Sequence, residues 1–342
     1  MINPKITIVT PSFNQGQYLE ETIVSVLDQK YPNLEYIIVD GGSTDNSVSI
    51  IKKYEKYLTH WVSEKDKGQS DAINKGIRKF TGDLFNWLNS DDFLEKEALS
   101  KLANAYHENP GKKVFVFGLS NLIEGEKIPF TKSNHPSQPL LYYCEPVIKQ
   151  QSTFYHRDAI EKFGTANIHL HYCMDYEWWL KFMFLFGTDA IYTSEELISV
   201  FRHHADSKTS TSYAKFLKDV GNMLYSMCIR FDLKDYSGLL KKGFEIDPHY
   251  HFNVTLADKD ESIVKSMVVF FILKWGRLVY TKQEFLFAKE IVKRIDFKRV
   301  DLSEIEKLWL TQLVNETKCL NWNLFRVKRK LQWLTNNLNK NG

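Results

Sequence analysis

EYIIVDGGSTD, residues 35–45, joins an apolar run rich in β-branched residues to a turn of small polar residues. The run Glu35–Val39 predicts a buried strand, and apolar residues at helical spacing between positions 48 and 58 predict a helix after the turn. Gly41 and Gly42 allow the backbone of the turn to approach a neighbour closely. A strand, a turn and a helix in this order form one unit of an α/β fold.

The same unit recurs on both sides of this stretch. Further strands are predicted at Lys5–Thr10, Trp61–Ser63, Leu84–Leu88 and Val114–Phe117, with amphipathic segments after the first three. Strands that alternate with helices favour a sheet whose strands run mainly parallel and whose faces are covered by helices. The predicted fold class is therefore α/β with a mainly parallel sheet.

The rest of the chain is less regular. Residues Gly118–Val147 are rich in Pro, Ser and Asn, which predicts a long surface loop. A helix at Asp175–Phe186 and strands at Ser152–Tyr155, Ala190–Tyr192 and Leu197–Phe201 follow. After Thr209 we expect only helices, at Tyr213–Arg230, Ile263–Val279, Gln283–Ile295 and Leu302–Val314.

Composition narrows the class of protein. The chain has 342 residues, a formal net charge of +3 and 43% hydrophobic residues, which is typical of a globular enzyme and gives no indication of a nucleic-acid partner. Its four cysteines form no C-x-x-C pair, so we expect a reducing, cytoplasmic location. We expect no export signal, because the strand-like run Ile6–Val9 begins almost at once. We also expect no membrane span, because the longest apolar run, Met267–Leu273, is far shorter than the roughly 20 residues that a span needs.

Polar turns follow the first four predicted strands, at residues 10–14, 40–45, 66–71 and 89–92. Three of the four contain acidic residues. Because turns after parallel strands meet at one sheet edge, their side chains should share a crevice. Carboxylates would repel a phosphate ligand unless a cation lies between them, and oxygen ligands suit Mg²⁺ or Mn²⁺. The turns therefore predict a metal-bridged diphosphate, although Ser43 and Asp45 are better interpreted as turn-forming and helix-capping residues.

The ordered motifs resemble glycosyltransferase family 2 over about Lys5 to Thr209. They are residues 10–14 (TPSFN), 39–45 (VDGGSTD), 71–76 (DAINKG) and 90–92 (SDD). The resemblance implies a Rossmann-like GT-A fold, a nucleotide-sugar donor, inversion at the anomeric carbon and a Mn²⁺ or Mg²⁺ ion. It also implies roles for individual residues. Nucleotide and donor binding falls to Thr10, Ser12, Asp40, Gly41, Asp71 and Asp91, and metal binding to Asp92 and His204.

A second set of residues resembles the acceptor half of the family's site. Asp175 lies where the family carries its general base, which removes a proton from the acceptor hydroxyl. Met174 replaces the acid that many members have before it, and Glu177 is the alternative base. Gln151, Glu177 and Trp178 are expected on the acceptor side.

These expectations define two predicted domains. Residues 1–210 form the GT-A catalytic domain, with nucleotide-sugar binding at about 1–118 and the acceptor side at about 119–210. Residues 211–342 form a helical C-terminal module. Its last segment spaces leucines and basic residues as an amphipathic helix over residues 324–338, which fits packing on neighbouring helices, a homodimer contact or peripheral attachment to an anionic membrane.

The predicted function is transfer of a hexosyl or N-acetylhexosaminyl group from a UDP-sugar to a saccharide or lipid-linked saccharide. Such a reaction belongs to bacterial-type surface polysaccharide or glycan assembly. Processive synthesis is disfavoured by the absence of spanning helices and of a Gln-x-x-Arg-Trp motif. The alternative is a non-catalytic sugar-nucleotide binding or scaffold protein, which would keep the nucleotide residues but need no base.

Overall fold

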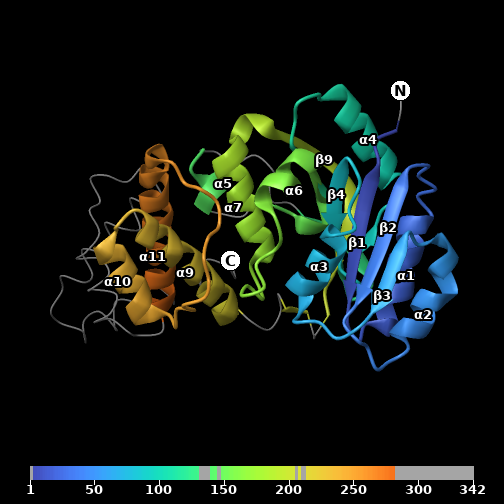
Figure 1. Ribbon diagram of the computed structural model, residues 1–342, viewed down its shortest axis with the longest axis horizontal. Helices are drawn as coiled ribbons and strands as arrows, with labels where there is room; N and C mark the ends of the chain where they lie inside the picture. The colour runs from blue at the N-terminus through green and yellow to red at the C-terminus, as the bar shows by residue number, and fades with distance from the viewer. Residues whose placement is uncertain (1–2, 131–138, 145–147, 205–206, 209–212, 282–342) are drawn as a thin grey trace, which may run out of the picture.

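The computed structural model describes residues 3–130, 139–144, 148–204, 207–208 and 213–281. Its strands form one sheet in the order β3-β2-β1-β4-β8-β6-β9-β5, with β7 paired to β6 (Figure 1). The strands are β1 Ile6–Ser12, β2 Leu34–Asp40, β3 His60–Ser63, β4 Leu84–Trp87, β5 Phe93–Leu94, β6 Val114–Ile123, β7 Glu126–Pro129, β8 Thr153–His156 and β9 Ile191–Arg202. The helices are α1 Gly16–Leu27, α2 Ser47–Tyr54, α3 Gln69–Ile77, α4 Ala98–Glu108, α5 Leu141–Cys144, α6 Arg157–Phe163, α7 Met174–Phe186, α9 Tyr213–Arg230, α10 Lys234–Gly243 and α11 Glu261–Thr281.

The first four strands are parallel, as predicted, and the later part of the sheet is mixed. β2 pairs in parallel with both β1 and β3, and β1 also pairs in parallel with β4. The register sets Asp40 opposite Ser12 on one side and Ser63 on the other. The loops after these strands therefore leave the sheet at the same level.

Helices cover both faces of the sheet, and a separate apolar core lies between the helices and the sheet on each face. One core joins the strands to α1, α2 and α4, and the other joins them to α3, α6 and α7. The second core continues into α9, α10 and α11, which stand beyond α7 at the far end of the molecule (Figure 1). The described helices of the C-terminal module thus share a core with the sheet.

Two sequence expectations about connections were wrong. Residues Gly118–Val147 are not one long loop, because β6 continues to Ile123 and turns back into β7. The turn residues Glu124 and Gly125 both have positive φ, 49° and 88°, which is the backbone of a tight two-residue hairpin. The two strands expected at 190–192 and 197–201 are a single strand, β9, whose pairing with β6 shifts register at Gly118.

The C-terminal predictions are tested only in part. The helices expected near 213–230 and 263–279 are present as α9 and α11. No helix in the described part of the chain is both long and apolar enough to cross a bilayer. The domain boundary near Ser210, the two later helices and the basic segment at 324–338 lie outside the described residues.

Candidate active site

The loops after β1 and β2 are held together by reciprocal hydrogen bonds. The Asn14 amide donates to Ser43 Oγ at 2.8 Å, and the Thr44 amide donates to Asn14 Oδ1 at 2.8 Å. Asp45 accepts the Gly16 and Ser47 amides at the starts of α1 and α2, each at 2.9 Å. Ser43 and Asp45 therefore shape the loops, as the sequence indicated.

Asp40 is fully buried and organises the β2 loop. One carboxylate oxygen accepts the Gly42 and Ser43 amides and the Ser63 hydroxyl, and the other accepts the Ser43 hydroxyl. Gly41 is needed here for space, because a Cβ at this position would lie 2.6 Å from Asp66 Oδ2. Asp66 was not among the predicted site residues, although its place in an acidic turn was the available signal.

The side chains of Thr10 and Ser12 lie in different environments. Thr10 is fully buried and its hydroxyl lies 3.1 Å from the Tyr36 hydroxyl, so its side chain does not reach the loop surface. Its role in nucleotide binding stays a prediction. The Ser12 hydroxyl is buried at the end of β1 and has no hydrogen-bond partner among the described residues. Ser12 is thus the better placed of the two to contact a ligand.

Asp71 lies in the first turn of α3 and has a local structural role. Its Oδ2 accepts the Lys67 amide at 3.1 Å, which closes the loop that leads into the helix. This hydrogen bond gives Asp71 a local structural role, and its role in nucleotide binding stays a prediction.

The adjacent carboxylates Asp91 and Asp92 lie in different surroundings. Asp92 is fully buried; it accepts the Arg202 amide on Oδ1 and the side-chain amides of Asn89 and Gln151 on Oδ2, at 3.0–3.2 Å. Burial, and then the neighbouring Asp91 charge, raise the pKa of Asp92 well above its usual value. Its three hydrogen bonds fill most of the roughly four acceptor positions of a carboxylate, so Asp92 is less open to a cation than Asp91, and its role as a metal ligand stays a prediction.

Asp91 is the member of the pair that faces a possible ligand. Its side chain is 19% exposed, and Oδ2 lies 2.9 Å from His204 Nε2. The other ring nitrogen of His204 is buried without a hydrogen-bond partner among the described residues, and the ring packs against Tyr18 at 4.9 Å. Asp91 and His204 therefore form a carboxylate–imidazole pair.

Thr22 and Arg202, which sequence reasoning did not select, hold this acidic loop in place. The Thr22 hydroxyl of α1 lies within hydrogen-bonding distance of the Ser90 and Asp92 carbonyls. Arg202, at the end of β9, donates its Nε to the Asp91 carbonyl at 3.0 Å, with its guanidinium over the Tyr18 ring. The only sequence signal for Arg202 was its position next to His203 and His204.

A chain of polar contacts leads from the acidic loop towards α7. Asn89 Oδ1 accepts the Gln69 side-chain amide at 2.7 Å, and Gln69 Oε1 accepts Lys208 Nζ at 2.8 Å. Lys208 Nζ also donates to the His171 carbonyl at 2.8 Å. The loop that carries Asp91 is thus connected to the segment immediately before α7.

Asp175 lies in the first turn of α7 and has the properties of a base. Burial raises its pKa to about 6, against the opposing influence of the Tyr176 amide and the Lys208 charge. Asp219 of α9 accepts the amides of residues 171–173 at 2.7–3.2 Å and so fixes the start of the helix. A carboxylate with a pKa near neutrality on a fixed helix start is suited to proton transfer.

Two of the expected acceptor-side residues are part of the core instead. Glu177 is fully buried, forms an ion pair with Lys181 at 3.1 Å and accepts the Tyr250 hydroxyl at 2.8 Å. Trp178 is fully buried among aromatic rings. α7 is buried from Tyr176 to Met183, so its second turn faces the core rather than a substrate. Gln151 does lie at the site, where it holds Asp92.

Replacing Glu177 with Ala should lower the free energy of unfolding by about 3–5 kcal/mol, because the Lys181 ammonium would remain buried without its partner. Chemical denaturation measures this change. Glu161→Ala, on the solvent side of α6, is the matched control and should change the stability by less than about 0.5 kcal/mol. A Glu177→Ala protein of unchanged stability would contradict the structural role.

Only a partial metal site is present among the described side chains. None of them form a group of three or more His, Cys, Asp or Glu residues able to hold an ion. The Asp91–His204 pair offers two ligands of a kind that Mn²⁺ accepts, and a diphosphate could supply further oxygens. The pair therefore fits a cation that is bound together with a nucleotide.

Comparison with known proteins gives consistent results. The sequence model of the family described as Glycosyl transferase family 2 matches residues 7–185. An uncharacterized glycosyltransferase of Rickettsia typhi is 25% identical over 316 residues, which cover 85% of this chain and 95% of the relative. The putative teichuronic acid biosynthesis glycosyltransferase TuaG of Bacillus subtilis is 35% identical over 142 residues, 41% of this chain and 56% of TuaG.

Solved structures show the same fold. Residues 1–349 of S. aureus TarS in complex with UDP-GlcNAc superpose with a TM-score of 0.54 at 18% identity, covering 86% of this chain and 89% of that one. The mannosyltransferase PcManGT of Pyrobaculum calidifontis, in complex with GDP-Man and Mn²⁺, gives a TM-score of 0.53 at 14% identity, covering 92% and 85%.

Proposed function

The chain belongs to glycosyltransferase family 2, and from this premise we propose that it transfers a sugar from a UDP-sugar to a saccharide hydroxyl with inversion at the anomeric carbon. The observation that carries the proposal is the run of hydrogen bonds from the loop that carries Asp91 to the segment before α7, through Asn89, Gln69 and Lys208. It joins the sheet edge where the sugar donor is expected to bind to the helix that carries the candidate base, Asp175. A protein that only binds nucleotide sugars would not need this connection.

In the proposed reaction Asp175 accepts the proton of the acceptor hydroxyl. The acceptor oxygen forms a bond to the anomeric carbon of the donor while the bond from that carbon to the diphosphate oxygen breaks. The electron pair of the broken bond leaves with the nucleoside diphosphate. Attack from the face opposite the diphosphate inverts the anomeric centre, and the elevated pKa of Asp175 suits proton removal near neutral pH.

On the donor side we assign nucleotide binding to the loops after β1 and β2, with Ser12 as a contact and Asp40 and Gly41 as the residues that shape the loops. Asp91 and His204 would hold Mn²⁺ or Mg²⁺ with the diphosphate. When bound, such a cation supplies Lewis-acid stabilisation of the leaving group. Gln151 would hold the loop that carries Asp91, because its side-chain amide donates to the adjacent Asp92.

The substrate classes rest on the named relatives. UDP-GlcNAc in the TarS complex supports a UDP-linked hexosyl or N-acetylhexosaminyl donor, and Mn²⁺ in the PcManGT complex supports the cation. The name of TuaG supports an acceptor in bacterial cell-surface polymer assembly. A lipid-linked acceptor would place the enzyme at the cytoplasmic face of a membrane, with the segment at 324–338 as the contact.

Donor turnover tests the proposal. With Mn²⁺ and a panel of UDP-sugars, we expect release of UDP that falls by about 100-fold or more when a chelator removes the cation, since Lewis-acid stabilisation is worth several kcal/mol. A coupled assay for UDP measures the rate with and without candidate saccharide acceptors. Nucleotide binding with no turnover of any donor would favour the non-catalytic alternative.

A further inference from the structure

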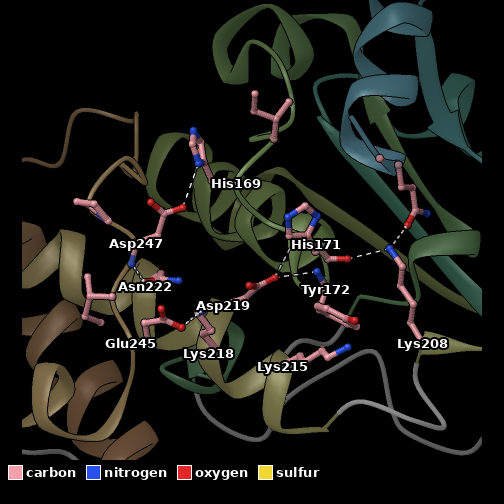
Figure 2. Close-up of a pocket in the computed structure, with 15 residues that line it drawn as sticks. His169, His171, Tyr172, Lys208, Lys215, Lys218, Asp219, Asn222, Glu245 and Asp247 are labelled. Atoms are coloured by element: carbon pink, nitrogen blue, oxygen red, sulfur yellow. Dashed lines mark hydrogen bonds and ion pairs between the residues drawn. The ribbon is translucent and has the colours of Figure 1, made fainter. Parts of the chain in front are cut away.

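A cavity of about 750 Å³ lies beside the candidate active site, between the sheet domain and the C-terminal helices (Figure 2). Its walls come from the start of α3, the segment before α7, the helix α9 and residues 245–248. Gln69 and Lys208, which link the cavity to the donor edge, both line it. None of the residues assigned above to the nucleotide, the cation or the base does so.

We propose that this cavity is the acceptor subsite and that it takes a saccharide or polyol bearing a carboxylate or phosphate group. The inference rests on the proposed function and adds the chemical class of the acceptor. A volume of this size is in the usual range of ligand pockets, about 300–1,000 Å³.

The acidic side chains of the cavity are already engaged. Glu245 pairs with Lys218 at 2.7 Å, and Asp247 pairs with His169 at 3.0 Å (Figure 2). Asp219 is buried, and its Oδ2 is occupied by the three backbone amides before α7. None of these carboxylates forms an ion pair with Lys208 or Lys215, although the Asp219 charge acts on Lys208 from a distance.

Two lysines of the cavity, Lys208 and Lys215, form no ion pair with a carboxylate among the described residues. Lys208 donates to two neutral oxygens, those of Gln69 and the His171 carbonyl. Lys215 is exposed in the first turns of α9. The two ammonium groups lie 5.6 and 5.4 Å from the centre of the same ring, Tyr172. An anionic group near this ring would relieve the repulsion between the two charges.

The position of Tyr172 relates the anion site to the chemistry. Tyr172 lies three residues before Asp175, and the Lys208 charge acts on the Asp175 carboxylate. The Tyr172 ring also offers an apolar surface to the face of a sugar. An acceptor with its anionic group near Lys208 and Lys215 would direct a hydroxyl of the adjoining sugar towards Asp175.

Binding of small probes to the full chain tests this inference. The probes are methyl β-glucuronide for a carboxylate, glycerol 3-phosphate for a phosphate, and methyl β-glucoside as the neutral counterpart of the first. In ligand-observed NMR titrations at low salt we expect at least one anionic probe to bind about tenfold more tightly than the glucoside. Lys215→Glu should lower the affinity for that probe by about tenfold or more. The anionic probe that binds identifies carboxylate or phosphate as the group.

Lys241→Glu is the matched control, because Lys241 is exposed on α10 away from the cavity and its reversal should leave probe binding unchanged. The affinity for UDP should be the same in the wild type, Lys215→Glu and Lys241→Glu. Equal binding of charged and neutral probes, or binding that Lys215→Glu does not alter, would overturn the inference. Failure to bind UDP would instead count against the proposed function, so the two failures are distinguishable.

Discussion

Asp175→Asn should lower kcat for sugar transfer by at least about 100-fold, the lower end of what a positioned general base contributes. Asparagine preserves the size of the side chain but cannot accept the proton of the acceptor hydroxyl. Because Asp175 lies on α7 and not on the loops after β1 and β2, the affinity for UDP should be unchanged. Turnover and equilibrium binding of UDP on the same preparation separate the two effects.

The pH dependence gives a second view of the same residue. The pKa of Asp175 is raised to about 6 by burial. A base acts in its deprotonated form, so kcat/KM should rise with pH through that value and level off above it. One pH unit below the pKa, the rate should be about a tenth of the plateau. A rate independent of pH between about 5 and 7, or Asp175→Asn turnover equal to wild type, would assign the base elsewhere.

Asp91→Asn should reduce cation-dependent turnover by about 100-fold or more, since the variant loses the carboxylate that can pair with a cation. The fold should remain intact because the Asp91 side chain is partly exposed and accepts no backbone amide from the residues that the structure describes. Turnover measured as a function of Mn²⁺ concentration should show a much higher half-saturation point.

Asp92→Asn is the informative comparison for Asp91→Asn. Asp92 accepts three hydrogen bonds while fully buried, and an asparagine amide would oppose some of those donors. We therefore expect a loss of stability of about 1–3 kcal/mol as the main effect. An Asp91→Asn enzyme with normal Mn²⁺ activation, together with a stable Asp92→Asn enzyme that has lost it, would return the metal role to Asp92.

The regular first half of the fold could be predicted because each strand and helix has its own local signal. Glu35–Val39 and the helical spacing after it are examples, and the first four predicted strands differ from the structure by at most two residues at each end. The β6–β7 hairpin was missed because its turn, Glu124-Gly125, lies among polar residues that resemble a loop.

The sequence predicted which loops form the candidate site, but not which side chains of those loops face a ligand. Asp91 and Asp92 are adjacent, and the side that each one faces is set by Arg202 and Gln151, which are distant in sequence. Glu177 was assigned to the substrate because the sequence does not show that Lys181 and Tyr250 enclose it. The cavity was not predicted, since its walls come from five separate segments.

The most direct test of the donor site is a crystal structure of the chain with UDP and Mn²⁺, with anomalous diffraction used to locate the manganese. The account predicts one manganese peak between the diphosphate, Asp91 Oδ2 and His204 Nε2, with Asp92 still bonded to Gln151. A manganese peak on Asp92, or a diphosphate bound away from Asp91 and His204, would contradict it.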